Sequence, residues 1–302
     1  MPKEFGKRVR TIREFKGITR EELCGDEANL SVRQLVRIEA GSSAPSLQKA
    51  LYIAKKLGVS ILELTDGKSL ELPGRYKELK YLILRMPTYM DENRLRLREE
   101  QFDEIYNVYY DNLPEEEQKV ITFVQAKFEV YQTANINFGS DLVEDYGDQV
   151  RKKTIYQLND LILIDLFLIC SIVSEFDEMI FDERTFDRLS LKLVNQLDHL
   201  PMEDLFLLNN VLLSCSHIAV KLEKYSTLRK LLDSSKQVMT KNQDFQKMPI
   251  YHFLEWEYAL YFLKDKALAQ EHYNQAILFA NMTGDLHLVS RLKEEWEKDI
   301  SQ

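Results

Sequence analysis

Residues 5–64 carry the start and stop signals of five short helices in close succession. Thr19 and, three residues later, Glu22 form a capping box, in which two side chains satisfy the free amides of a first helical turn. Other N-caps and glycine stops alternate along the segment: Ser31, Ser46 and Ser60 are expected to begin helices, and Gly17, Gly41 and Gly58 to end them. The fourth helix is expected to run through Leu47, Leu51, Ala54 and Leu57.

The second and third of these helices, within residues 18–23 and 30–41, are spaced as a helix-turn-helix pair. Leu30, Leu35 and Ile38 are its expected core positions, and Ser31 caps the third helix. The other side chains of that helix then project outward: Val32, Arg33, Gln34, Val36 and Arg37. Arginine matches the O6 and N7 atoms of guanine, glutamine matches adenine, and valine meets a thymine methyl group. The pattern predicts a helix that reads double-stranded DNA, although Arg33 and Arg37 alone would also fit a solvated face.

The charge of the chain is distributed unevenly. Residues 1–66 carry 12 Lys and Arg against 9 Asp and Glu, whereas the whole 302-residue chain has a net charge of −9. A basic head on an acidic tail suits a protein that binds a polyanion with its head alone. Several head residues are candidate phosphate contacts, or else simply solvated charges: Arg8, Arg10, Arg13, Arg20, Lys49 and Lys55.

The head resembles the Cro/C1-type, or Xre, helix-turn-helix domains. The resemblance rests on T-x-E-E-L at residues 19–23, the Ser31 cap, R-I-E-x-G at 37–41, and P-S-L…A-x-x-L-G-V-S within 45–60. Arg20 departs from the pattern, since the family usually has Gln there, and we expect it to contact phosphate. Because one such head presents too little surface for tight specific binding, it is expected to bind an inverted repeat as a homodimer.

The rest of the chain is predicted to be almost entirely helical. Residues 67–74 are the expected linker, and residues 75–302 the second domain. Its helices are expected near residues 75–85, 92–111, 115–134, 140–152, 157–175, 183–197, 202–222, 226–240, 247–263, 266–281 and 285–298. Short connections between them predict antiparallel hairpins stacked into an all-α solenoid. The domain resembles degenerate tetratricopeptide repeats, most clearly at residues 267–280.

A helix-turn-helix joined to such a solenoid resembles the peptide-pheromone receptors of the Rgg and PlcR group. V-R-Q-L-V-R-I-E at residues 32–39 and L-P-E-E-E at 113–117 are most similar to the ComR-type competence regulators of that group. The resemblance implies a cytoplasmic, quorum-sensing transcription factor, an activator that binds a short imported peptide. The alternative is an Xre-type repressor whose solenoid binds a protein partner instead.

A polar stripe on an apolar helix is the predicted peptide site. Asn210, Ser214, His217 and Lys221 recur at intervals of three and four residues, and Asn209 is adjacent. Amides there could hold a peptide backbone, and Lys221 a carboxylate. The same stripe could instead bond to neighbouring helices or face water. Asp165 and Glu129 are carboxylates in apolar company, for which a structural hydrogen bond is favoured over a ligand contact.

Three successive carboxylates, Glu115, Glu116 and Glu117, follow Pro114. We hypothesise that they form a regulatory latch, which holds Arg33 or Arg37 against the tail until a peptide binds. Acidic residues are also favoured in the first turn of any helix, which is the alternative interpretation.

Several other classes of protein are disfavoured. The sequence has no Walker A, GxGxxG or GxSxG motif, and its five His and three Cys are scattered, so neither an enzyme nor a metal or other cofactor is expected. The basic start of the chain has no apolar run of the kind found in signal peptides. Residues 161–173, the longest apolar run, are too short to span a membrane, so no membrane association is expected.

Overall fold

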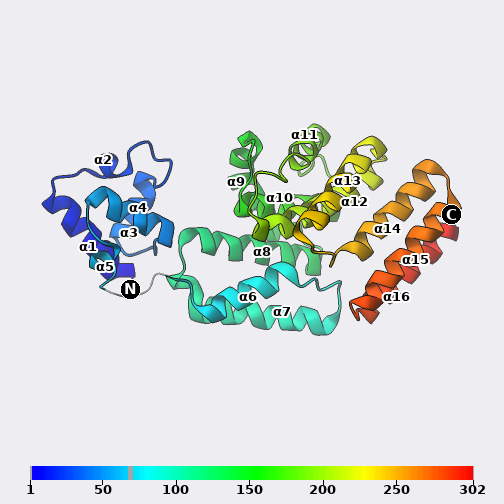
Figure 1. Ribbon diagram of the computed structural model, residues 1–302, viewed down its shortest axis with the longest axis horizontal. Helices are drawn as coiled ribbons and strands as arrows, with labels where there is room; N and C mark the ends of the chain where they lie inside the picture. Colours follow the sequence, from blue (N-terminus) through cyan, green and yellow to red (C-terminus); the bar gives the residue numbers. More distant parts are fainter. Residues whose placement is uncertain (1, 67–70, 302) are drawn as a thin grey trace. The chain divides into compact units, whose positions relative to one another are not determined.

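The computed structural model describes residues 2–66 and 71–301, which form helices joined by short turns (Figure 1). Over these residues no strand is present, and the only sheet-like contact is an isolated bridge between Ala44 and Pro114. The all-α prediction is therefore confirmed. Within the described chain, no helix is long and apolar enough to cross a membrane.

The head consists of the five predicted short helices. They are α1 (Pro2–Phe15), α2 (Arg20–Cys24), α3 (Val32–Glu39), α4 (Leu47–Leu57) and α5 (Ile61–Thr65). The predicted capping box of Thr19 and Glu22 is present, and Ser31 and Ser60 begin α3 and α5 with boxes of the same kind. Local sequence signals thus fix where these three helices begin.

The head encloses one hydrophobic core. Leu30, Leu35 and Ile38 are buried in it as predicted. The crossing of α1 and α3 is so close that a Cβ atom on Gly6 would lie 1.9 Å from the carbonyl oxygen of Ile38, which excludes any larger residue. On α4 the buried side chains are Ala50, Ile53, Ala54 and Leu57. Leu47 and Leu51 instead lie on the outer face of that helix and are about half exposed.

The described chain divides into two compact units. The first contains residues 2–66, 71–86 and Arg96–Thr122, and the second contains Pro87–Leu95 and residues 123–301. The first unit therefore includes the head together with α6 (Gly74–Arg85), α7 (Glu92–Glu104, from Arg96 on) and the start of α8 (Glu115–Thr133). Of the predicted linker, residues 67–70 lie outside the described residues; residues 71–73 are irregular, and α6 begins at Gly74.

The second unit is a stack of helical hairpins. It contains the rest of α8, then α9 (Ser140–Lys152), α10 (Leu158–Val173), α11 (Glu183–Leu193), α12 (Leu205–Lys221), α13 (Tyr225–Asn242), α14 (Met248–Tyr258), α15 (Lys266–Met282) and α16 (Leu286–Ser301). Helix α12 packs against both α10 and α13, and α15 packs against α14 and α16 (Figure 1). The tail thus has the predicted hairpin architecture.

Two long predicted helices change their winding near their C-terminal ends. α7 continues as a π-helical turn, Ile105–Tyr109, and then as a 3-10 turn, Tyr110–Asn112. α14 continues in the same way as a π-helical turn, Ala259–Leu263. Such wider turns keep the helical direction but rotate the following side chains, which the periodicity of the sequence did not indicate.

Candidate functional site

The start of α3 is held by reciprocal hydrogen bonds between Ser31 and Gln34. The Ser31 hydroxyl accepts from the Gln34 amide at 3.2 Å, and the Gln34 Oε1 atom accepts from the Ser31 amide at 3.3 Å. Gln34 therefore helps to hold the helix start, a role that the sequence analysis did not assign to it. Ser31 has the capping role that was expected.

The other predicted readers on α3 differ in exposure. Arg33 and Val36 are exposed, whereas Arg37 is partly buried. Val32 packs against the head core and presents only part of its side chain. The exposed face of α3 is therefore built mainly around Arg33, Val36 and Arg37.

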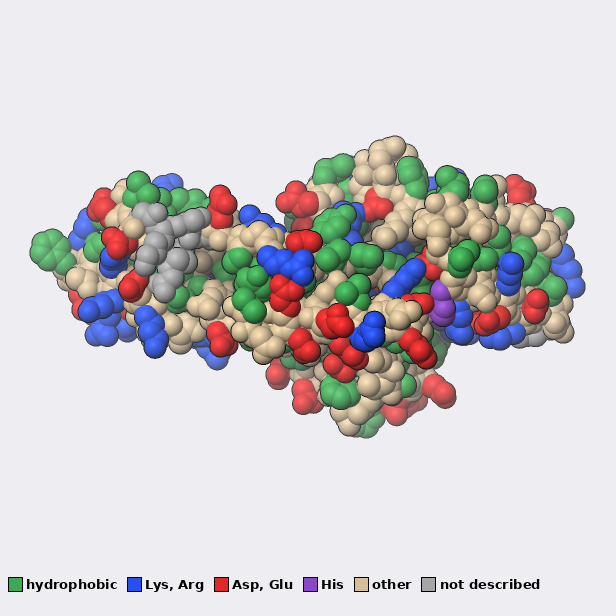
Figure 2. All heavy atoms as spheres, turned by 90° about the horizontal axis from the view of Figure 1, so that it is seen from below, with side chains coloured by type: hydrophobic (Ala, Val, Ile, Leu, Met, Phe, Trp, Pro, Cys, Tyr) green, Lys and Arg blue, Asp and Glu red, His purple; other side chains and the backbone are tan. Residues whose placement is uncertain are grey.

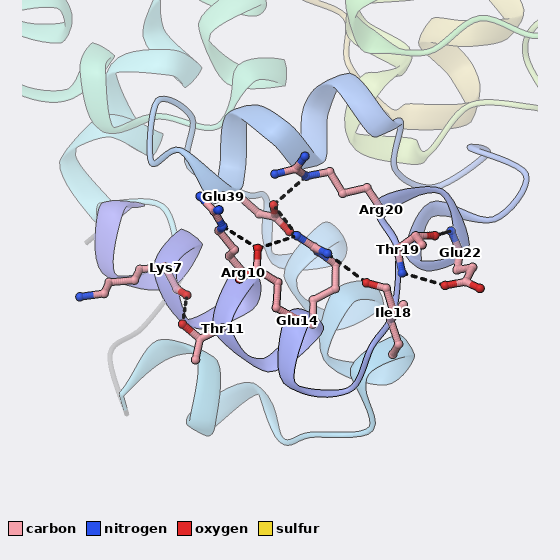
Figure 3. Close-up of polar contacts among 10 residues, drawn as sticks. Lys7, Arg10, Thr11, Glu14, Ile18, Thr19, Arg20, Glu22 and Glu39 are labelled. Carbon is pink, nitrogen blue, oxygen red and sulfur yellow. Dashed lines mark hydrogen bonds and ion pairs between the residues drawn. The ribbon is translucent and has the colours of Figure 1, made fainter.

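Glu39, at the end of α3, is the centre of a buried ionic cluster. Its carboxylate accepts from the Arg13 Nε atom at 2.6 Å and from the Arg20 Nε atom at 2.8 Å. Figure 3 shows Arg20 pointing toward Glu39 from α2. Arg13 also donates to the Ile18 carbonyl at 3.0 Å, and its hydrogen bond to Glu39 raises its pKa. The interpretation of Arg13 as a phosphate contact was wrong, because its guanidinium is buried and satisfied inside the head.

The remaining candidate phosphate contacts lie nearer the surface. Arg10 pairs with Glu14 at 2.8 Å, and Arg8 with Asp66 at 2.9 Å. Arg20 stays partly exposed beside Glu39, and Lys55 is exposed. On the face drawn in Figure 2, Lys and Arg side chains gather at the head, while Asp and Glu are more frequent over the tail.

The first turn of α8 contacts the head. The Oε2 atom of Glu115 lies 3.2 Å from the Nη1 atom of Arg37, and Glu116 is paired with Lys49 of α4. The isolated bridge between Ala44 and Pro114 lies next to these pairs in the sequence. The structure thus brings Glu115 and Arg37 together. It adds Lys49, which was expected to contact phosphate or to be simply a solvated charge.

Glu117 and Arg33 do not take part in this contact. Glu117 accepts hydrogen bonds from the Tyr76 hydroxyl at 2.7 Å and from Lys80 at 2.8 Å, so it joins α8 to α6. Over the described residues, no carboxylate lies within ion-pair distance of Arg33. Successive residues of a helix point in different directions, and the turn that aims Glu115 and Glu116 at the head directs Glu117 elsewhere.

The polar stripe of α12 is the only part of that helix, apart from Phe206, that reaches the surface. Asn210, Ser214 and His217 are partly exposed and Lys221 is exposed, among otherwise buried neighbours. Burial, followed by the charge of Lys221, lowers the pKa of His217 to about 4. The imidazole is therefore neutral near pH 7 and is available as a hydrogen-bond donor or acceptor.

Asn209 does not share this stripe. Its Oδ1 atom accepts a 2.6 Å hydrogen bond from the Ser235 hydroxyl of α13, and its side chain is buried. Its amide therefore joins two helices, and the structure does not place it with the other predicted peptide-binding residues. The adjacent Asn210 points toward the exposed side of α12.

Ser214 connects the stripe to an ion pair formed between two other helices. Its hydroxyl donates to the Oδ1 atom of Asp165 on α10 at 3.0 Å, and Asp165 is also paired with Lys127 of α8. Asp165 is thus held by structural bonds, as the sequence analysis favoured, but at the edge of the exposed stripe. Lys127 lies among the apolar residues of α8, and the spacing of residues in the sequence did not indicate that it pairs with Asp165.

Most of the aromatic side chains near the end of the tail are structural. Tyr251 and Trp256 are buried, and Trp256 stacks edge-on against Trp296 of α16. Trp256 and Tyr261 both donate to Asp299, at 2.8 and 2.7 Å, and so attach α16 to the preceding hairpin. In the part of the chain that is described, no group of three or more His, Cys, Asp or Glu side chains has a geometry that could hold a metal ion.

Comparison with known proteins agrees with this arrangement. The family model described as ComR tetratricopeptide matches residues 73–296, and a helix-turn-helix model matches residues 9–64. A comparison with curated proteins finds no match.

Solved structures are similar over nearly the whole chain. ComR from Streptococcus suis is 40% identical, with a TM-score of 0.74, over 98% of this chain and 95% of that one. ComR from S. thermophilus, solved in complex with DNA and its signalling peptide ComS, is 30% identical, with a TM-score of 0.69, over 98% and 99% of the two chains. PlcR from Bacillus thuringiensis, at 14% identity and a TM-score of 0.55 over 99% and 100%, shares the fold. The chain belongs to the ComR family of competence regulators.

Proposed function

We propose that this chain is a transcriptional activator that binds a short imported signalling peptide in its tail and then binds an inverted-repeat promoter site as a homodimer. The observation that supports it most strongly is the full-length similarity to a ComR that holds DNA and a signalling peptide in one complex. The ComR family regulates transcription, and we propose no enzymatic activity or cofactor for this chain. The proposal places it in the cytoplasm, where both DNA and imported peptide are available.

DNA reading is assigned to residues 1–66. Arg33 is exposed on α3, and Arg37 and Val36 lie one turn further along the same face. Gln34 and Val32 lie at the start of the helix, where Ser31 fixes the first turn. Arg20 is positioned by Glu39 at the start of α2, from which its exposed side contacts phosphate. These residues form the proposed DNA interface, with Arg33 and Arg37 as its main base readers.

Peptide binding is assigned to residues 75–302, the tail beyond the linker at residues 67–74. The partly exposed side chains of Asn210, Ser214 and His217 offer hydrogen-bonding groups along one line of α12, with Lys221 at its end. An extended peptide needs such groups for its backbone, with apolar pockets between them. Asn209 enters the proposed site only indirectly, because it fixes the position of α12 against α13.

Regulation is assigned to the contact between α8 and the head. With Arg37 paired to Glu115 and Lys49 to Glu116, two cations that would face DNA are already neutralised. A ligand shifts such an equilibrium only if it binds one of the two states more tightly. We infer that peptide binding favours the state in which these pairs are open. Glu117 acts within the tail, as the anchor of α8 on α6.

Fluorescence anisotropy of the full chain on a labelled pool of promoter fragments tests the proposal. It is measured with and without the small-peptide fraction of spent medium from the host. The expected result is tighter binding with the fraction, a gain that protease treatment of the fraction abolishes and that Arg33→Ala greatly reduces. Equal binding with and without the fraction would contradict peptide sensing and favour a protein partner for the tail.

A further inference from the structure

Lys247 is a partly buried cation without a partner anion. It lies at the N-cap position of α14, and its ammonium group is 5.5 Å from the centre of the Tyr89 ring. Within the described residues, no carboxylate lies within ion-pair distance of this ammonium group. The aromatic ring supplies a weak attraction to the charge, which does not replace an anion.

The charged groups that act on Lys247 are one lysine, Lys127, and two carboxylates, Asp165 and Asp244. Burial, followed by the nearby charge of Lys127, lowers the pKa of Lys247 to about 8, while Asp165 and Asp244 oppose the change. Asp165 is already engaged by Lys127 and by the Ser214 hydroxyl. The one buried carboxylate of this cluster is therefore shared, and Lys247 is left without an anion of its own.

This cluster joins the proposed peptide site. Ser214 belongs to the exposed stripe of α12, and it bonds to the carboxylate that both lysines share as a neighbour. Five separate segments of the second compact unit contribute side chains to this cluster: Tyr89, Lys127, Asp165, Ser214 and Lys247. A partly buried ammonium group costs free energy when it lacks a counter-charge, and a ligand carboxylate would remove that cost.

We propose that Lys247, with Lys127 beside it, forms a cationic subsite for a carboxylate of the signalling peptide. This inference rests on the proposed function, because it names the chemistry of the ligand that the tail binds. The carboxylate has two possible sources, the peptide's C-terminal group or an Asp or Glu side chain. Both present the same planar anion to the ammonium group.

The test uses the full chain and the peptide isolated from spent medium by the anisotropy assay. The peptide is synthesised with a free C-terminus, with a C-terminal amide, and with each acidic side chain replaced by its amide. Binding of each form is measured by calorimetry. The wild-type chain is expected to bind one neutralised form about tenfold or more weakly than the free acid, since breaking a desolvated charge pair is costly. The form that loses affinity identifies the source of the carboxylate.

Variants of Lys247 separate this subsite from general electrostatics. Lys247→Met is expected to weaken binding of the free-acid peptide by a similar factor. The variant should then bind the acid and the neutralised forms of the peptide almost equally. Lys247→Arg is expected to retain the discrimination. Lys230→Met, which removes an exposed charge from α13, is the matched control and should behave as the wild type.

The outcomes distinguish this inference from the function on which it rests. If spent medium yields no peptide that binds the chain, the proposed function fails and the subsite fails with it. If the wild-type chain binds a peptide but binds all its neutralised forms equally well, only the cationic subsite is overturned. If Lys247→Met retains full discrimination, the carboxylate binds elsewhere.

Discussion

Arg37 of α3 and Glu115 of α8 lie 3.2 Å apart, so the helix predicted to read DNA is in contact with the first turn of a tail helix. The pair of Lys49 with Glu116 lies on the same turn. Ion pairs that are partly open to solvent each contribute about 0.2–1 kcal/mol. Two such pairs are strong enough to favour the state in which the head contacts α8. They are weak enough for ligand binding to reverse that preference, as expected for a regulatory contact.

Arg33 and Lys55 are predicted to contribute to DNA binding in different ways. Arg33→Ala should weaken binding to the preferred site by about 1–3 kcal/mol and relax its specificity, because a base contact is lost. Lys55→Ala should weaken binding to all DNA sequences alike. It should also reduce the slope of log affinity against log salt concentration by about one. Anisotropy titrations on specific and random duplexes at several salt concentrations measure both. A uniform loss for Arg33→Ala would remove it from the base readers.

Glu39→Gln is predicted to destabilise the head. It would leave the buried Arg13 guanidinium without its buried counter-charge, a change that costs about 3–5 kcal/mol when one partner of a buried pair is removed. Hydrogen exchange of the buried amides of α1 and α3 in the full chain measures this loss. Glu78→Gln, which removes an exposed partner of Arg75, should leave exchange unchanged. Equal protection in both variants would show that the buried cluster is not stabilising.

Neighbouring asparagines of α12 are predicted to have different roles. Asn209→Ala should lower stability by about 1–3 kcal/mol, because the buried Ser235 hydroxyl loses its acceptor. Asn210→Ala should leave stability unchanged and weaken peptide binding several-fold. Urea unfolding and calorimetry with the isolated peptide distinguish the two. Loss of peptide binding in a fully stable Asn209→Ala variant would restore Asn209 to the site.

Glu257 is predicted to make stability fall as pH rises. Burial, and then the charge of Asp299, raises its pKa to about 8, with Glu295 adding to the effect and Lys221 opposing it. The folded state then holds this proton more tightly than the unfolded chain, so the contribution to stability is complete below about pH 4.5 and is lost by about pH 8.

The size of the effect is on the order of a few kcal/mol. Glu257→Gln keeps the neutral shape and should therefore lose less stability between pH 6 and about pH 8.5 than the wild type does. Urea unfolding of both proteins at these two pH values gives the difference. The same pH dependence in both would mean that Glu257 is ionised in the folded chain.

Short-range features of the fold were predictable from the sequence. Thr19, Ser31 and Ser60 begin helices because each side chain caps amides of its own first turn, which involves only neighbouring residues. Leu30, Leu35 and Ile38 form the buried side of the helix-turn-helix because apolar spacing alone defines that face. These signals are local, so tertiary packing did not alter them.

Contacts between distant residues were not predictable in this way. Arg13 and Arg10 are both basic residues of one helix, yet only the position of Glu39 across the core makes Arg13 a buried partner. Asn209 and Asn210 differ by a rotation of about 100° around α12, and the packing of α13 decides which one is buried. Lys247 lies in a turn, where no periodicity relates it to Asp165 or Lys127.

The contact of α8 with the head is tested most directly by the DNA affinity of the chain without peptide. Anisotropy on the promoter duplex would compare the wild type with Glu115→Lys/Glu116→Lys, in which Arg37 and Lys49 are repelled. The control is Glu144→Lys/Asp145→Lys, which makes the same charge change on exposed residues of α9. The account predicts a gain of about tenfold or more for the first variant alone, since like charges in contact cost several kcal/mol. Equal affinities for the two variants would contradict the account.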